Sequence, residues 1–355
     1  MPHQPLRIVD ANLNRSAEGL RVLEDVARFI LDDPDLSRRL RTVRHRLTEA
    51  GRSLGTAPLS ERDSEHDVGR ENLPKQSYPD LISLVEANAG RVEESLRVLE
   101  ELARLDELSA TLNAAGFEQA RFALYPVEKE MVSRLSRHDK LRQMTGLYVI
   151  LDRQALAGRD ELEFARQTIE GGANVIQLRD KQSCAGELLP LALRLKELCH
   201  KSGVLFIIND YLDLALAAGA DGLHLGPKDL PPAAARSWLP QDRLIGCSVT
   251  TVSGAIRAKK EGADYVAVGS MFPTGSKKGA VVVGLDRLKK VKKAVSPPVV
   301  AIGGITENNV GEVIAAGADC VAVIDAVLGK PDARKATRQL LRQIKEAKRK
   351  CPKTS

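Results

Sequence analysis

The chain has 355 residues, of which 43% are hydrophobic and 28% are charged, as is typical of a folded protein with about two domains. No apolar run reaches the ~18 residues that a membrane-spanning helix needs, and the opening MPHQPLRIVD lacks the pattern of a secretory signal. The five cysteines include no CxxC pair, which argues against a zinc site or a disulfide framework. We therefore expect a cytoplasmic protein with reduced thiols and no membrane partner.

Much of the net charge of +6 lies near the end of the chain. Residues 334–353, RKATRQLLRQIKEAKRKCPK, predict a helix with a basic, solvated face, and aromatic residues do not alternate with the basic ones. We therefore expect no nucleic-acid partner. A positive field also favours anionic substrates, so the charge is compatible with an enzyme that acts on them.

Residues 6 to about 131 have the apolar spacing of helices and contain an internal repeat. Segments 8–29 and 84–105 are identical at 12 of 22 positions when they are aligned at a spacing of 76 residues. The repeat predicts an all-α domain at residues 1–135, built as a small bundle with pseudo-twofold symmetry. The polar residues shared by the two copies are Asn12/Asn88, Arg15/Arg91, Glu18/Glu94, Arg21/Arg97, Glu24/Glu100 and Arg28/Arg104.

The segment between the two copies, residues 51–79, has no clear period. A loop this long inside a compact unit is usually functional or disordered. Its residues Arg62, Asp63 and Asp67, together with the paired arginines of the repeat, are candidates for binding phosphate and metal. The alternative is a bundle that is held by ion pairs between residues three or four apart and that mediates dimerisation.

After about residue 138, short β-branched runs alternate with amphipathic helices. The motif GGAN, or its variants AGAD and EGAD, precedes four of these runs, and its glycine ends a helix in the left-handed region before a buried strand begins. Eight such units predict a (β/α)₈ TIM barrel at residues 140–350, with a doubly wound open sheet as the alternative. The eight runs are GLYVILD, NVIQLRD, LFIIND, DGLHLG, RLIGCS, DYVAVG, PVVAIGG and DCVAVID.

Charged side chains follow the second, third and fourth predicted strands, at the end of a TIM barrel where catalytic residues lie. Alternation places Gln177, Arg179 and Lys181 on one side, and the two cations suit the oxygens of a diphosphate. Asp210 and Asp229 predict a Mg²⁺ site, because Mg²⁺ takes one or two carboxylates together with phosphate oxygens and water. Ion pairing by the cations and helix capping by the aspartates are the alternatives.

The other strand ends predict a second anion site. Ser248, after the fifth strand, can hydrogen-bond a leaving group or cap the next helix. The loop 272–279, FPTGSKKG, suits closure over a phosphate, with a plain exposed loop as the alternative. Gly304 and the residues after the eighth strand predict a backbone cradle for a monophosphate. Two phosphate sites indicate an enzyme that joins two phosphorylated substrates.

Residues 146–325 resemble thiamine-phosphate synthases in the motifs QLRDK, ND, HLG-PK with a following Asp, IGCS, PT-S-K and AIGGI. The resemblance implies Mg²⁺ ligation by Asp210 and Asp229. The residues that it implies for the pyrimidine diphosphate are Gln177, Leu178, Arg179, Asp180, Lys181, Asn209 and Ser248. Those that it implies for the thiazole phosphate are Thr274, Gly275, Ser276, Lys277, Gly304, Ile324 and Asp325.

The resemblance implies a transferase of thiamine biosynthesis that condenses 4-amino-2-methyl-5-(diphosphomethyl)pyrimidine with 4-methyl-5-(2-phosphoethyl)thiazole, or its carboxylated form. The products would be thiamine phosphate and pyrophosphate. It implies that Mg²⁺, Arg179 and Lys181 stabilise the leaving pyrophosphate, and that Ser248 and Lys277 complete the catalytic set. The thiazole nitrogen would then attack the pyrimidine methylene carbon, with no side chain acting as general base.

Two positions depart from the family pattern. Ser276 replaces the usual second Thr of the PTxTK loop, and Asp325 stands where many members have Ser. A carboxylate beside a phosphate repels it unless its side chain turns away and only the backbone N–H binds.

The N-terminal half resembles the helical extension of some bacterial members, which implies a hydroxymethylpyrimidine-phosphate kinase. For the barrel, a thiazole tautomerase-like isomerase and a regulator that senses a phosphorylated metabolite are the alternative functions. A homo-oligomer is compatible with either half.

Overall fold

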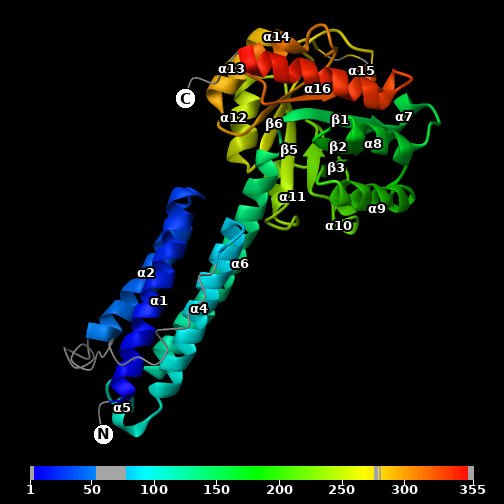
Figure 1. The fold of residues 1–355 in the computed structure, drawn as a ribbon. Coiled ribbons are helices and arrows are strands. Elements are labelled where there is room, and N and C mark those ends of the chain that lie inside the picture. Colours follow the sequence, from blue (N-terminus) through cyan, green and yellow to red (C-terminus); the bar gives the residue numbers. More distant parts are fainter. Residues whose placement is uncertain (1–3, 53–76, 276–278, 280, 351–355) are drawn as a thin grey trace. The chain divides into compact units, whose positions relative to one another are not determined.

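The computed structural model describes residues 4–52, 77–275, 279 and 281–350, which form two compact units, residues 1–136 and 137–355 (Figure 1). The predicted loop residues Arg62, Asp63 and Asp67 lie outside the described residues. None of the described helices is long and apolar enough to cross a membrane. The helices that begin in the first unit are α1 (Gln4–Phe29), α2 (Pro34–Arg52), α4 (Leu81–Leu102), α5 (Asp106–Ser109) and α6 (Ala114–Arg142).

The two copies of the repeat lie on α1 and α4, which pack against each other. Leu20 on α1 and its counterpart Leu96 on α4 are fully buried. Gly19 permits a close approach of the two helices, because a Cβ atom at this position would lie 2.6 Å from Cγ2 of Val92. The duplicated apolar spacing therefore reflects two helices that bury equivalent faces against each other.

A duplicated buried carboxylate ties each copy of the repeat to a neighbouring helix. Glu24 on α1 binds Arg41 at 2.8 Å and Arg44 at 2.9 Å, both on α2. Its counterpart Glu100 on α4 binds Arg121 on α6 at 3.0 Å. Burial alone would raise the pKa of each carboxyl group, but hydrogen bonds from the arginines lower it. This part of the shared polar set therefore has structural partners within the bundle.

We expect the substitution Glu100→Ala to lower the free energy of unfolding, because it removes a buried carboxylate and leaves Arg121 without its carboxylate partner. Glu100 also pairs with Arg97 and Arg104. The matched control is Glu101→Ala, since Glu101 pairs with the same two arginines but has a side chain that is 49% exposed. The control should change stability by no more than about 0.5 kcal/mol. The measurement is the free energy of unfolding of the full chain in urea. Equal effects of the two substitutions would contradict this interpretation.

The second unit is a closed parallel barrel in which β1 pairs with both β2 and β8. The predicted TIM barrel is confirmed, and the alternative of an open sheet is wrong. The eight strands are β1 (Gly146–Asp152), β2 (Val175–Arg179), β3 (Leu205–Asn209), β4 (Gly222–Leu225), β5 (Leu244–Val249), β6 (Tyr265–Val268), β7 (Val299–Ile302) and β8 (Cys320–Val323).

Helices surround the strands in the order that the alternating pattern predicts (Figure 1). They are α7 (Arg153–Leu156), α8 (Glu161–Glu170), α9 (Ala185–Lys201), α10 (Leu212–Ala217), α11 (Pro232–Arg236), α12 (Val252–Lys260), α13 (Gly284–Ala294), α14 (Val310–Ala315), α15 (Asp325–Leu328) and α16 (Ala333–Lys350).

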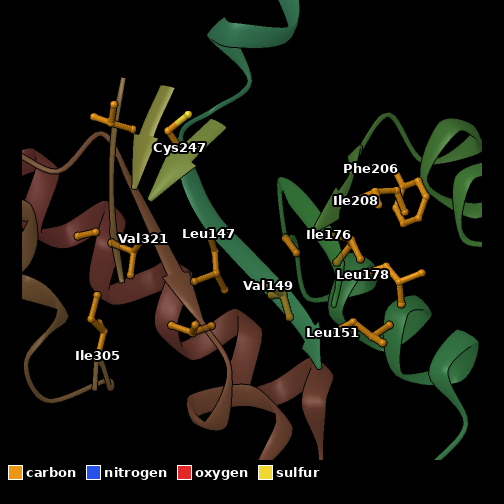
Figure 2. Packing of buried hydrophobic residues seen from close by; sticks show 14 of the residues in the cluster. Leu147, Val149, Leu151, Ile176, Leu178, Phe206, Ile208, Cys247, Ile305 and Val321 are labelled. Carbon is orange, nitrogen blue, oxygen red and sulfur yellow. The ribbon is translucent and has the colours of Figure 1, made fainter. Parts of the chain in front are cut away.

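Alternate residues of each strand point into two separate apolar layers. Leu147, Val149 and Leu151 of β1 belong to the large layer between strands and helices, part of which is shown in Figure 2. Tyr148 and Ile150, the residues between them, belong to the smaller cluster that fills the barrel interior. A polar residue at an interior position therefore faces its counterparts from other strands rather than solvent.

The repeated GGAN and AGAD motifs have a second role that the sequence did not reveal. In each motif the side chain of the last residue accepts a hydrogen bond from a backbone N–H at the start of the preceding strand. Asn174 accepts from Leu147 N–H of β1 at 3.1 Å, and Asp221 accepts from Phe206 N–H of β3 at 3.0 Å. The other two copies do the same for β5 and β7, through Asp264 and Asp319. The motif therefore ends a helix and also closes the amino end of every second strand.

Candidate active site

A guanidinium group is held in place by a carboxylate at the carboxyl ends of β1 and β2. Arg179, the last residue of β2, is half-buried and forms an ion pair with Asp152, the last residue of β1. Asp152 is 4% exposed and also accepts hydrogen bonds from Gln154 N–H at 3.1 Å and Ala155 N–H at 3.2 Å. Asp152 is a site residue that the sequence analysis missed. Its signal was an aspartate at the end of the first predicted strand.

The side chains of Leu178 and Asp180 do not share the orientation of Arg179. Leu178 packs in the layer between strands and helices, so a contact from it to a ligand would come from its backbone. Asp180 accepts hydrogen bonds from Gln182 N–H at 2.7 Å and the Ser183 hydroxyl at 2.8 Å, and it binds Arg153 at 2.9 Å. Its carboxylate therefore orders the loop between β2 and α9.

Burial opposes ionisation of Asp180, but these hydrogen bonds lower its pKa to about 2. A lowered pKa contributes stability that is present above the unfolded-state pKa of about 4 and is lost as the pH falls toward 2. We expect Asp180→Asn to be less stable than the wild type at pH 7 and the difference to shrink between about pH 4 and pH 2. The free energy of unfolding, measured across this range, checks the prediction. A difference that is independent of pH would contradict it.

Two aspartates at the ends of β3 and β4 lie next to a lysine. Lys181 forms an ion pair with Asp210, whose backbone φ of +66° is rare outside glycine and typical of functional sites. Asp229 accepts a hydrogen bond from Gly226 N–H at 2.7 Å. Burial raises the pKa of Asp229, and its hydrogen bond with Asp210 raises it further, while the charge of Lys181 lowers it.

This pair of carboxylates fits Mg²⁺. Both groups are hard oxygen donors, and their mutual repulsion would be relieved by a shared divalent cation. Within the described part of the chain, no three acidic, histidine or cysteine side chains gather as a metal site. The protein would therefore supply few ligands, and the rest of the octahedron would be filled by water and phosphate oxygens.

Asn209 has an unused donor in the same region. It is 7% exposed, and its Nδ2 atom has no hydrogen-bond partner among the described residues. A buried amide without a partner is uncommon in native proteins and points to a bound acceptor. The structure thus brings together Asn209, Asp210, Asp229, Arg179 and Lys181, as the sequence predicts for adjacent strand ends.

Ser248 lies at the end of β5, beside a residue of β4. Its Oγ lies 2.9 Å from Nε2 of His224 on β4. Cys247 packs on the opposite, helix-facing side, as alternation predicts. The predicted alternative role for Ser248, capping of the next helix, is wrong, because the side chain that caps α12 belongs to Thr251.

The predicted phosphate cradle lies after β7. Gly304 has a φ of +65°, and a Cβ atom there would lie 2.8 Å from Cβ of Phe272, so only glycine fits. Asn309 Nδ2 donates to the carbonyl of Gly304 at 3.0 Å and fixes the turn. Ile324 precedes the short helix α15, which begins at Asp325. Of the β6 loop, Thr274 and Gly275 are described, whereas Ser276 and Lys277 lie outside the described residues.

Comparisons with known proteins identify the family of the chain. A family model described as thiamine monophosphate synthase matches residues 147–327. The thiamine-phosphate synthase of Thermosynechococcus vestitus is 39% identical over 345 residues, which cover 96% of this chain and 95% of the relative. The chain belongs to the thiamine-phosphate synthase family. The predicted family, enzyme class and place in thiamine biosynthesis are thereby confirmed.

Two further members of the family match a little over half of the chain. The thiamine-phosphate synthase of Methanoculleus marisnigri is 52% identical over 203 residues, which cover 57% of this chain and 96% of the relative. A solved structure of thiamine phosphate pyrophosphorylase from Pyrococcus furiosus is 42% identical, with a TM-score of 0.54, and it covers 58% of this chain and 98% of its own.

The helical half has a family match of its own. A model described as the ThiD2 family matches residues 7–130, which lie within the first unit. This match agrees with the predicted helical extension. It leaves the activity of that half as a matter for experiment.

Proposed function

We propose that the barrel condenses 4-amino-2-methyl-5-(diphosphomethyl)pyrimidine with 4-methyl-5-(2-phosphoethyl)thiazole, or its carboxylated form, to give thiamine phosphate and pyrophosphate. One observation carries the proposal: the cations Arg179 and Lys181 lie at the end of β2, next to the neighbouring carboxylates of Asp210 and Asp229 at the ends of β3 and β4. Cations suit a diphosphate, and paired carboxylates suit the Mg²⁺ that a diphosphate binds. The thiazole tautomerase alternative, an isomerase of one monophosphate, gives no reason for this full set.

The pyrimidine would bind beside the buried amides. The Nδ2 donor of Asn209 would be satisfied by a ring nitrogen of the pyrimidine, which replaces the missing acceptor. Gln177, 2% exposed on the neighbouring strand, lies beneath the same region of the barrel mouth. The diphosphate would then extend toward Arg179, Lys181 and the hydroxyl of Ser248.

Catalysis in this arrangement consists of stabilising the leaving group and positioning the nucleophile. As the carbon–oxygen bond to the diphosphate breaks, Arg179, Lys181 and Ser248 donate hydrogen bonds to the oxygens that gain charge. Asp210 and Asp229 would hold Mg²⁺, which as a Lewis acid supplies further stabilisation of the same charge. The electron-rich aminopyrimidine carries the positive charge that develops on the methylene carbon, and no side chain has to remove a proton.

The cradle after β7 would hold the phosphate of the thiazole. The backbone N–H groups of Gly304 and Ile324 would donate hydrogen bonds to it, and Thr274 and Gly275 lie on the loop after β6. With its phosphate anchored, the thiazole nitrogen is directed at the methylene carbon and forms the new carbon–nitrogen bond. We assign the same binding role to Ser276 and Lys277 from the family pattern, together with the backbone of Asp325.

The test is an assay of the purified chain with both substrates and Mg²⁺, in which pyrophosphate and thiamine phosphate should appear in equal amounts. Removal of Mg²⁺ by a chelator should stop the reaction. Binding of the substrates without release of pyrophosphate would support a regulator instead. Rearrangement of the thiazole phosphate alone would support the tautomerase alternative.

We also propose, on the ThiD2-family match, that the first unit phosphorylates hydroxymethylpyrimidine phosphate to the diphosphate. Such an activity would supply the barrel with its own substrate. The test replaces the pyrimidine diphosphate in the assay with the monophosphate and ATP. Formation of thiamine phosphate only from the diphosphate would refute a kinase in this chain and leave the barrel's function intact.

A further inference from the structure

Five polar side chains from five strands form a continuous hydrogen-bonded chain across the barrel interior. Gln177 Nε2 donates to the Tyr148 hydroxyl at 2.7 Å, and this hydroxyl lies 3.1 Å from that of Tyr265. The Tyr265 hydroxyl lies 3.1 Å from Nδ1 of His224, whose Nε2 lies 2.9 Å from Oγ of Ser248. The chain therefore links the proposed pyrimidine side of the site to its proposed diphosphate side.

The middle of this hydrogen-bonded network is buried. Tyr265 is 0%, Tyr148 2% and His224 8% exposed, so the two phenols are shielded from bulk solvent. Burial raises the pKa of both tyrosines well above its usual value, so each phenol keeps its proton near neutral pH. In such surroundings a hydrogen bond left unmade costs about 1–3 kcal/mol, which strongly favours one consistent arrangement of protons.

The arrangement follows from counting donors and acceptors. Because the amide of Gln177 donates to Tyr148, the proton of Tyr148 is directed to Tyr265, its other recorded partner among the described residues. Tyr265 must then direct its own proton to Nδ1 of His224. A neutral imidazole that accepts at Nδ1 carries its proton at Nε2, and this proton goes to Oγ of Ser248.

We propose that His224, Tyr265 and Tyr148 are positioning residues that fix the direction of the Ser248 hydroxyl. With its oxygen already accepting from His224, Ser248 has to donate its own proton elsewhere, and the barrel mouth is where an acceptor would lie. Ser248 is thereby prepared as a donor to the oxygen of a leaving diphosphate, without reorganisation during the reaction. The functional part of this inference rests on the role proposed for Ser248, whereas the order of protons does not.

The barrel interior has room for these five hydrogen-bonded side chains. Gly246, the residue of β5 two positions before Ser248, leaves the space into which the ring of Tyr265 fits, since a Cβ atom there would overlap the phenol. The rings of His224 and Tyr265 lie 5.7 Å apart, and those of Tyr148 and Tyr265 lie 6.3 Å apart. Three rings packed in one interior cluster hold the hydrogen-bonding atoms in line.

The first test reads the proton on His224 by nitrogen NMR of the ligand-free, full-length protein at a pH where the imidazole is neutral. The signal is assigned by its loss in His224→Asn. We expect the proton on Nε2 in the wild type and on Nδ1 in Gln177→Glu, because a carboxylate only accepts and so reverses every donor in the chain. A proton on Nδ1 in the wild type, or on Nε2 in Gln177→Glu, would overturn the proposal.

The second test is a double-mutant cycle on pyrophosphate release. Tyr265→Phe should lower kcat about tenfold with little change in KM, but less than about twofold when Ser248 is already alanine. His224→Gln, whose amide can still reach Ser248, should retain more activity than His224→Asn. Additive losses from Tyr265→Phe and Ser248→Ala would show that Tyr265 acts independently of Ser248. If the wild type releases no pyrophosphate, the proposed function fails, while the NMR test still decides the order of protons.

Discussion

Replacing Asp210 with asparagine is expected to lower the rate of pyrophosphate release by about 10²- to 10³-fold. Asparagine tolerates the left-handed backbone that Asp210 adopts, so the change removes a charge without adding strain. The loss follows because a divalent cation would keep only Asp229 as a charged ligand, and Lys181 would lose its ion-pair partner. The measurement is pyrophosphate release at increasing concentrations of Mg²⁺.

The matched control for this prediction is Asp213→Asn. Asp213 is an exposed aspartate three residues later, in the first turn of α10. Among the described residues, its carboxylate accepts a hydrogen bond only from the N–H of Leu214. It should leave both the rate and the Mg²⁺ dependence unchanged. Normal turnover of Asp210→Asn at limiting Mg²⁺ would show that this carboxylate does not hold the metal.

The substitution Arg179→Ala should be similarly severe, with a loss of about 10²- to 10³-fold in kcat/KM. The guanidinium group of Arg179 is planar and is held at the end of β2 by Asp152. A diphosphate can accept two parallel hydrogen bonds from it. Arg179→Lys should recover only part of the loss, because an ammonium group is a single point charge. Initial rates at varied pyrimidine diphosphate measure both variants.

Two further variants make this second prediction specific. Arg194→Ala, on the outer face of α9, removes the same charge from an exposed position and should have no effect. Asp152→Asn keeps the cap of α7 but weakens the hold on Arg179, and should lower the rate less than Arg179→Ala does. An Arg179→Ala enzyme with wild-type kcat/KM would remove this guanidinium from the proposed mechanism.

The barrel could be predicted from sequence because its signals are local. A glycine that ends a helix, an acidic or amide residue and a buried run recur along the second half of the chain, and each can be recognised without knowing its neighbours. The same reasoning places Arg179, Lys181, Asp210 and Asp229 at strand ends, and adjacent strands then bring them together. These residues could be found because position along a strand decides where they lie.

The remaining features depend on distances between residues far apart in the chain. Asp152 is separated from Arg179 by 27 residues, and only the register of β1 against β2 makes them partners. Tyr148 and Tyr265 are 117 residues apart and meet across the barrel interior, which no spacing in the sequence records. In the helical half, the buried carboxylates of the repeat look like exposed charges until the arginines of the neighbouring helices are seen.

The acceptors at the amino ends of alternate strands make the barrel a structure with two differently constrained ends. Asn174, Asp221, Asp264 and Asp319 close one end by binding strand N–H groups, and none of them belongs to the proposed chemistry at the other end. Loops at the reactive end can therefore be diversified by evolution or by an engineer without breaking the closure that holds the ring of strands. Selection for new substrates and selection for a stable scaffold act on separate sets of residues in this molecule.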